Sequence, residues 1–329
     1  MVTAVSTGGN AGMATAYVAR KMGLSATVVV PSSTPPLVVR RLQEQGATVK
    51  VAGKVWDDAN AEALRLAETE QLTFVPPFDH PLLWEGHASV VAEVAAALGP
   101  GARPGAVLLS VGGGGLLCGV VRGLKDAGWA DVPVIAMETV GADCFNAAIK
   151  AGELVTLDDI TSEAKCLGAK TVCRRAFELS QSGEATIISE LVTDQEALRA
   201  IQMFLGQWLP AVHNPALLPV LKGVCWFCVP DEERVLVEMA CGAALAAVYS
   251  GLIPRLQAQG RRPPRLLLFL LFICFVKEAE VRTRAVSSSC IQNLTCRLPT
   301  PLRPLLVIVC GGSSINMEQL ISLQQKLQS

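Results

Sequence analysis

Short strand patterns alternate with helical patterns along the first half of the chain. Residues 26–30 are alanine or β-branched residues that stop at a proline, and residues 11–22 are alanine-rich and end at a glycine. Residues 106–111 form an apolar strand pattern that leads through four glycines into a helical pattern at residues 116–127. Strands separated by helices of this length are joined by crossovers into a parallel sheet. Further strands are expected at residues 3–6, 47–51, 74–75 and 132–137, and further helices at residues 37–44, 57–70 and 86–98.

This alternation predicts an α/β chain with open sheets. A closed barrel is disfavoured, because the regular units are too few and several connections are too long. Hydrophobic residues make up 51% of the chain and charged residues 17%, so a large buried core is expected. The net charge of −1 gives no basic surface for a nucleic acid.

The cysteines and the apolar run bear on where in the cell the protein is expected. Eleven cysteines follow no disulfide spacing, and Met1 leads into a glycine-rich turn rather than a secretion signal. We therefore expect reduced thiols in a cytoplasmic protein. The apolar run at residues 266–276 is shorter than the roughly 20 residues that a membrane helix needs. We expect a buried strand or an insert there, and no membrane partner.

The strongest local signal is the run Gly112, Gly113, Gly114 and Gly115 between a strand and a helix. Glycines let an anion approach the N–H groups of a helix N-terminus, so this run predicts a phosphate site. The alternative is a tight turn that binds nothing. No Lys-Ser or Lys-Thr pair follows, and the G-x-G-x-x-G spacing fails. An acid at Glu138, at the end of the next strand, keeps a nicotinamide-binding enzyme as a second possibility.

Two further turns have the same form. Residues 6–12 contain Asn10, whose amide could contact a ligand or cap the following helix. Residues 307–314 are a strand that ends in Cys310 and two glycines; a small core residue is the simpler interpretation of Cys310. Ligands of open α/β sheets bind beyond the carboxyl ends of the strands, so the three turns suggest one shared site.

Several longer blocks carry a family resemblance. They are residues 10–13 (NAGM), 76–89 (PPFDHPLLWEGHAS), 110–119, 134–139, 241–247 and 307–312. Together they resemble the serine/threonine dehydratase branch of the fold-type-II, tryptophan synthase β-like enzymes that use pyridoxal 5'-phosphate (PLP). The resemblance covers about residues 5–205, 233–266 and 305 to the end. It implies two open parallel-sheet domains: an incomplete small domain at residues 1–80 and a large PLP-binding domain at residues 81–329.

The resemblance also implies a function and its residues. The activity would be ammonia-lyase chemistry on a small amino acid, in a cytoplasmic homodimer, with L-serine giving pyruvate and L-threonine giving 2-oxobutanoate. A thiol facing the ring nitrogen leaves PLP a weaker electron sink, which suits β-elimination. The implied PLP ligands are Gly112, Gly113, Gly114, Gly115 and Leu116 for the phosphate, Asn10 for the 3'-hydroxyl and Cys310 for the ring nitrogen. Thr7 and Gly8 would bind the substrate carboxylate, and Phe78 would lie near the ring. A monovalent or divalent cation would be bound by Glu138, Ala142, Cys144, Leu167 and Ala169.

The chain also departs from the family pattern. The family attaches PLP to a lysine about two dozen residues before the Asn10 turn, whereas nine residues precede Asn10 here and none is lysine. Residues 206–230 and 267–302 are inserts without an evident regular pattern. We therefore expect the chain as written to be impaired. A β-replacing or racemising relative, and an inactive isoform that binds or pairs with another subunit, remain open.

Overall fold

The computed structural model describes residues 3–7, 9–213, 237–258, 266–273, 303–310 and 317–328. Two compact units divide the chain: unit 1 is Met1–His80 and unit 2 is Pro81–Ser329. Each unit has a sheet of its own, and every strand pairing in both sheets is parallel. The predicted α/β class with two parallel sheets is confirmed. No helix within the described ranges is long and apolar enough to cross a lipid bilayer.

Unit 1 is a four-stranded sheet in the order β3-β2-β1-β4 with helices on both faces. One of its two central strands, β2, shows why both faces are covered. Val28 and Val30 pack with α1 and α2, while Val29, which points the other way, packs with α3. The elements are β1 (Thr3–Thr7), α1 (Gly9–Lys21), β2 (Ser25–Val30), α2 (Pro36–Glu44), β3 (Thr48–Val51), α3 (Trp56–Thr69) and β4 (Thr73–Phe74).

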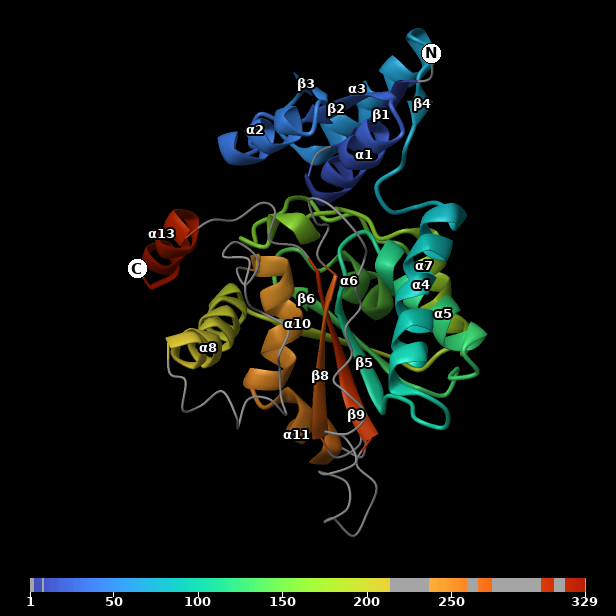
Figure 1. Ribbon diagram of the computed structural model, residues 1–329, viewed down its shortest axis with the longest axis vertical. Helices are drawn as coiled ribbons and strands as arrows, with labels where there is room; N and C mark the ends of the chain where they lie inside the picture. The colour runs from blue at the N-terminus through green and yellow to red at the C-terminus, as the bar shows by residue number, and fades with distance from the viewer. Residues whose placement is uncertain are drawn as a thin grey trace. The chain divides into compact units, whose positions relative to one another are not determined.

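Unit 2 is a five-stranded sheet in the order β7-β6-β5-β9-β8. Helices α8 and α10 lie to one side of it, and α4 and α5 lie to the other (Figure 1). The elements up to α8 are α4 (Pro81–Leu98), β5 (Ala106–Ser110), α5 (Gly115–Asp126), β6 (Val134–Thr139), α6 (Cys144–Ala151), a 3-10 turn (Lys165–Leu167), α7 (Arg174–Ser182), β7 (Ile187–Val192) and α8 (Asp194–His213). The remaining ones are α10 (Met239–Tyr249), α11 (Leu252–Ala258), β8 (Leu266–Ile273), β9 (Arg303–Cys310) and α13 (Met317–Gln328).

Most expected elements are found within one or two residues of their predicted ends. The largest difference is α4, which begins at Pro81 rather than at residue 86. Proline is favoured in the first turn of a helix, where its missing N–H needs no partner. The strand expected at residues 132–137 runs from Val134 to Thr139, which brings Glu138 inside it.

Two glycines hold α4 against α5. A Cβ on Gly119 would overlap the Cβ of His87, and one on Gly123 would lie 2.7 Å from the carbonyl oxygen of Ala88. Both approaches are closer than van der Waals contact, so only glycine permits them. The two helices therefore form one closely packed layer to one side of the sheet.

The two insert segments contain more regular structure than the sequence suggests. α8 continues to His213, and β8 pairs with β9 along eight residues, from Leu266↔Arg303 to Ile273↔Cys310. The expectation of no evident regular pattern is wrong for residues 206–213, whereas residues 266–273 form a strand, one of the two alternatives expected for the apolar run. An apolar run beside an otherwise unpaired edge of β9 gains a complete ladder of backbone hydrogen bonds. The other parts of both segments, residues 214–230 and 274–302, lie outside the described residues.

Candidate functional site

The glycine turn, residues 112–115, connects the carboxyl end of β5 to the first turn of α5. Gly114 has a φ of 89°, a left-handed conformation that favours glycine. A Cβ on Gly114 would also lie 2.7 Å from the Cβ of Ala176. A Cβ on Gly112 would lie 3.1 Å from the Cα of Leu167. The turn is therefore packed tightly from behind, and glycine is required at Gly114 for two separate reasons.

The front of the turn can accept an anion. The first N–H groups of α5 have no acceptor within the helix, and Leu116, in that first turn, is half-buried. The carbonyl of Gly113 is turned away from them, because it accepts a hydrogen bond from the N–H of Cys173 at 3.0 Å. An anion that approaches the partial positive charge of this helix N-terminus then finds glycines, which have no side chains to block it. The residues present fit the phosphate group of PLP.

Glu138 is a fully buried acid near the end of β6. Its two carboxylate oxygens accept the N–H groups of Phe145 and Asn146, at 2.9 and 2.8 Å, in the first turn of α6. Burial raises the pKa of Glu138 to about 8, while these two hydrogen bonds act in the opposite direction. Glu138 thus serves as the acceptor for the N-terminus of α6, a role that the sequence did not indicate.

Of the other expected cation ligands, Cys144 and Leu167 lie beside Gly112 of the glycine turn. The thiol of Cys144 is 3.5 Å from the carbonyl oxygen of Gly112. The carbonyl of Leu167 accepts the N–H of Ala169 at 2.8 Å, and the N–H of Ala142 is bonded to Thr139. Within the described ranges, no group of three or more His, Cys, Asp or Glu side chains could hold a metal ion. Burial is also the main cause that raises the pKa of the Cys144 thiol.

In unit 1, a tryptophan joins two of the expected substrate residues. The indole N–H of Trp56 donates to the hydroxyl of Thr7 at 3.1 Å, and its ring centroid lies 5.7 Å from that of Phe78. Thr7 is fully buried at the end of β1. No sequence signal pointed to Trp56, which begins α3 ahead of two acidic residues and belongs to no motif. Only the packing of α3 beside β1 reveals the contact.

The turn after β1 differs in detail from the prediction. Asn10 is the second residue of α1, so it lies inside the first helical turn rather than at a cap before it. Gly12 is the closely packed glycine here, because a Cβ on it would be 2.7 Å from the carbonyl oxygen of Thr7. Gly8 lies outside the described residues.

The backbone of Cys310 ends β9 beside β5. The register pairs Ala106 with Leu305 and Leu108 with Val307. Extended by three residues, it puts Cys310 opposite Val111, which directly precedes the glycine turn. Cys310 and the glycine turn therefore lie at the same, carboxyl edge of the sheet of unit 2. The side chain of Cys310 lies outside the described residues.

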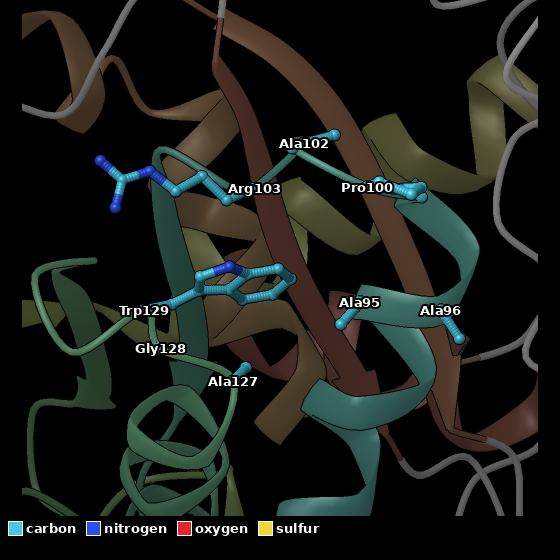
Figure 2. A pocket seen from close by; sticks show the side chains of 10 residues that line it. Ala95, Ala96, Pro100, Ala102, Arg103, Ala127, Gly128 and Trp129 are labelled. Carbon is cyan, nitrogen blue, oxygen red and sulfur yellow. The ribbon is translucent and has the colours of Figure 1, made fainter.

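Two measurable cavities lie elsewhere in unit 2. One, of about 620 Å³, is bounded by the end of α4, the loop before β5 and the end of α5. The indole of Trp129 extends across it toward Ala95, and Arg103 points away from it (Figure 2). This hollow is at the amino end of β5, opposite the glycine turn. The second, of about 300 Å³, lies between α5 and α7.

Comparison with known proteins identifies the family. Residues 1–269 match the family model described as pyridoxal-phosphate dependent enzyme. The chain is 54% identical over 269 residues to the Homo sapiens protein serine dehydratase-like, with 82% of this chain and 73% of that protein covered. It is 46% identical over 323 residues to L-serine dehydratase/L-threonine deaminase of Homo sapiens, with 98% and 79% covered.

A solved structure agrees with these relatives. The L-serine ammonia-lyase from the fungus Rhizomucor miehei superposes with a TM-score of 0.72 at 28% identity, covering 99% of this chain and 82% of that chain. Maize serine racemase shares the fold with a TM-score of 0.66 at 18% identity. From the family match, the sequence relatives and this fold, the chain belongs to the pyridoxal-phosphate dependent enzymes.

Proposed function

We propose that this protein is a PLP-dependent ammonia-lyase that converts L-serine to pyruvate and ammonia, and L-threonine to 2-oxobutanoate and ammonia. The glycine turn is the observation that carries the proposal. It presents the N-terminus of α5 at a strand end, and its shape requires glycine at Gly114. The names of the human and fungal relatives support the same substrate class.

The proposed cofactor site uses backbone and neutral side chains. Gly112, Gly113, Gly114, Gly115 and Leu116 would hold the phosphate, Asn10 the 3'-hydroxyl, and Cys310 the ring nitrogen. Bound PLP supplies an electron-withdrawing ring that acidifies the Cα–H bond of the amino acid. A thiol next to the ring nitrogen does not hold a proton there as a carboxylate would, which favours loss of the substrate hydroxyl.

The proposed substrate pocket is in unit 1. Thr7 and Gly8 would bind the substrate carboxylate, and Phe78 would lie beside the ring. Trp56 would act as a positioning residue, because it contacts both Thr7 and Phe78. A buried hydroxyl fixed by an indole N–H has its remaining hydrogen available for a carboxylate oxygen.

A cation is proposed beside the glycine turn. Glu138 would bind it, with carbonyl groups of Ala142, Cys144, Leu167 and Ala169. The cation would favour the charged form of Glu138, whose pKa burial otherwise raises to about 8. We also propose a cytoplasmic homodimer.

Covalent attachment of PLP needs a lysine, and the described lysines are poorly suited to it. All eight are half-buried or exposed: Lys21, Lys50, Lys54, Lys125, Lys150, Lys165, Lys170 and Lys326. Lys170 donates to the carbonyl of Asp158, and Lys326 is paired with Glu163 at 2.8 Å. Lys222 and Lys277 lie outside the described residues. We therefore propose that the 329 residues by themselves bind PLP without a lysine adduct and eliminate slowly.

Absorbance titration of the purified chain with PLP tests the proposal. Saturable binding is expected in the wild type and a large loss in Gly114→Ala. Gly128→Ala is the matched control, since Gly128 also has a positive φ but has no atom within 4 Å of the place where a Cβ would be. Absence of saturable binding would overturn the proposal.

Borohydride reduction followed by peptide mapping, together with pyruvate release from L-serine, tests the attachment step. Binding without a reduced lysine peptide, and with little pyruvate, is expected. A reduced lysine peptide with rapid pyruvate release would contradict the slow elimination and identify the lysine. Binding with no pyruvate at all would favour the inactive isoform that pairs with another subunit.

A further inference from the structure

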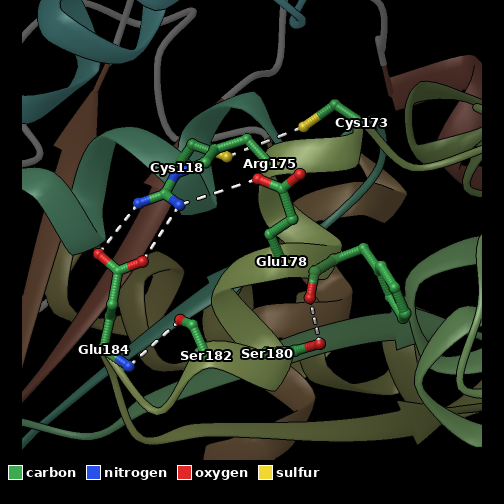
Figure 3. Close-up of polar contacts among 8 residues, drawn as sticks. Cys118, Cys173, Arg175, Glu178, Ser180, Ser182 and Glu184 are labelled. Carbon is green, nitrogen blue, oxygen red and sulfur yellow. Dashed lines mark hydrogen bonds and ion pairs between the residues drawn. The ribbon is translucent and has the colours of Figure 1, made fainter.

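Two buried cysteines face each other directly behind the glycine turn. Cys118, in α5, and Cys173, the residue before α7, have their sulfur atoms 3.8 Å apart (Figure 3). They are 4% and 3% exposed. A disulfide requires a sulfur–sulfur distance of about 2.05 Å, so a shift of roughly 1.8 Å would join them. The pair belongs to neighbouring elements, which can move by that amount more easily than two residues within one helix.

Both cysteines are hydrogen-bonded to the turn. The N–H of Cys118 donates to the carbonyl of Gly114, and the N–H of Cys173 donates to the carbonyl of Gly113, each at 3.0 Å. The sulfur of Cys173 also lies 3.2 Å from where a Cβ of Gly114 would be. A backbone shift of either cysteine therefore acts directly on Gly113 or Gly114.

A cavity borders one of the two cysteines. Cys118 lines the cavity of about 300 Å³ between α5 and α7, together with Trp84, Arg175 and Glu184. This volume is much larger than a water molecule or a small hydroperoxide. The half-buried guanidinium of Arg175 is held there by two hydrogen bonds of 3.1 Å to Glu184 (Figure 3).

Arg175 interacts electrostatically with Cys118, and its guanidinium is also paired with Glu184 and Glu178. Hydrogen bonding to Glu184 is the main cause that raises the pKa of Arg175, and the charge of Cys118 adds to it. The thiolate is the form of a cysteine that reacts with peroxides. Disulfides in reducing compartments are typically transient and redox-sensing.

We propose that Cys118 and Cys173 are an oxidisable pair: a hydroperoxide joins them into a reversible disulfide, which distorts the glycine turn and weakens its hold on phosphate. The disulfide itself is independent of the cofactor. The effect on phosphate rests on the proposed function.

The chemistry balances in two steps. The Cys118 thiolate attacks one peroxide oxygen, the O–O bond breaks, and the departing hydroxide takes a proton to become water. The Cys173 sulfur then attacks the Cys118 sulfenic acid, the S–O bond breaks, and a second water leaves. Two thiols have lost two electrons in total to one hydrogen peroxide, and a dithiol reductant reverses the change.

Peptide mapping by mass spectrometry tests the disulfide directly. The full chain is treated with hydrogen peroxide, alkylated and digested without reductant. A linked peptide containing Cys118 and Cys173 is expected, and it should disappear after dithiothreitol. Oxidation of the exposed Cys166 without any Cys118–Cys173 peptide would overturn the proposal. This measurement on the wild-type chain does not depend on any variant folding.

PLP titration before and after oxidation tests the coupling. We expect the Kd for PLP to rise about tenfold on oxidation, as for the loss of one hydrogen bond to a charged group. Cys173→Ala and Cys118→Ala should abolish this change, whereas Cys166→Ala should retain it. An unchanged Kd despite a mapped disulfide would overturn the coupling. Failure of the reduced protein to bind PLP would count against the proposed function, while the peptide map still decides the disulfide.

Discussion

The turns after β1 and β5 look alike in sequence and differ in packing. Each follows a parallel strand, contains consecutive glycines and opens a helix. Gly9, in the turn after β1, has a φ of 72° but no atom within 4 Å of the place where a Cβ would be. Gly114, in the turn after β5, has a φ of 89° and three side-chain atoms within 3.2 Å of the equivalent place.

The difference separates two uses of glycine. Gly9 satisfies only a backbone requirement, and its surroundings have room. Gly114 satisfies the same requirement and also lets α7 pack against the turn. A site that must hold a phosphate at fixed distances gains from such support, because rigid surroundings keep the N–H groups oriented. Four sets of substitutions test this contrast and its consequences in the two units.

The largest effect is expected for Gly114→Ala compared with Gly9→Ala. Left-handed strain costs about 1–2 kcal/mol at either position. Overlap with Ala176 and Val172 should add roughly 1–3 kcal/mol at Gly114 alone. Urea unfolding measures both losses. Equal losses for the two variants would show that packing behind the glycine turn contributes nothing.

The next effect concerns Glu138, the buried acid near the end of β6. Thr7, the buried polar residue at the end of β1 in unit 1, has no ionisable group. The folded-state pKa of Glu138, about 8, exceeds the unfolded value of 4.5. The folded chain therefore holds the proton more tightly than the unfolded chain. The resulting stabilisation is full below pH 4.5 and is lost as the pH rises to about 8.

Glu138→Gln should remove this pH dependence, which we expect to lower the free energy of unfolding of the wild type by about 2–4 kcal/mol across this pH range. Urea midpoints across that pH range measure it, with Glu153→Gln at an exposed position as the control. A bound cation should flatten the wild-type curve as well. A wild-type curve that rises with pH in this range would contradict the assignment.

A smaller effect is expected where α4 meets α5. Gly119→Ala puts a Cβ within 2.7 Å of the Trp84 carbonyl and still closer to His87. The overlap should cost roughly 1–3 kcal/mol, reduced by the better helix propensity of alanine. Gly86→Ala in α4 meets no neighbour and should stabilise by up to about 1 kcal/mol. Thermal unfolding should move the two variants in opposite directions, and a shared direction would refute the close-packing argument.

The smallest effect is expected for Trp56→Phe. This change keeps a ring beside Phe78 but removes the N–H that binds Thr7, which should cost about 1 kcal/mol. If Thr7 binds the substrate carboxylate, the KM for L-serine should rise while kcat changes little. Trp129→Phe is the matched control, because Trp129 lines the cavity of about 620 Å³ at the amino end of β5. A fall in kcat with an unchanged KM would argue against a positioning role.

The glycine turn shows how far local sequence carries the site. Four consecutive glycines between a strand and a helix predict a phosphate-binding turn from backbone chemistry alone. Trp56 shows the limit, since no local pattern connects residue 56 with Thr7 or Phe78. The same holds for Glu138, whose bonds to Phe145 and Asn146 depend on where α6 begins.

The alternation of strands and helices, the parallel sheets and the glycine turns all follow from the sequence, because periodicity and glycine conformational freedom are local properties. The neighbours of each strand do not follow from it, and the tertiary packing brings β9 next to β5 and β8 next to β9. The same packing sets what stands behind the glycine turn, where Cys118 approaches from α5, and Cys173 and Ala176 from the start of α7. Such contacts depend on distances between elements remote in sequence, which no local pattern encodes.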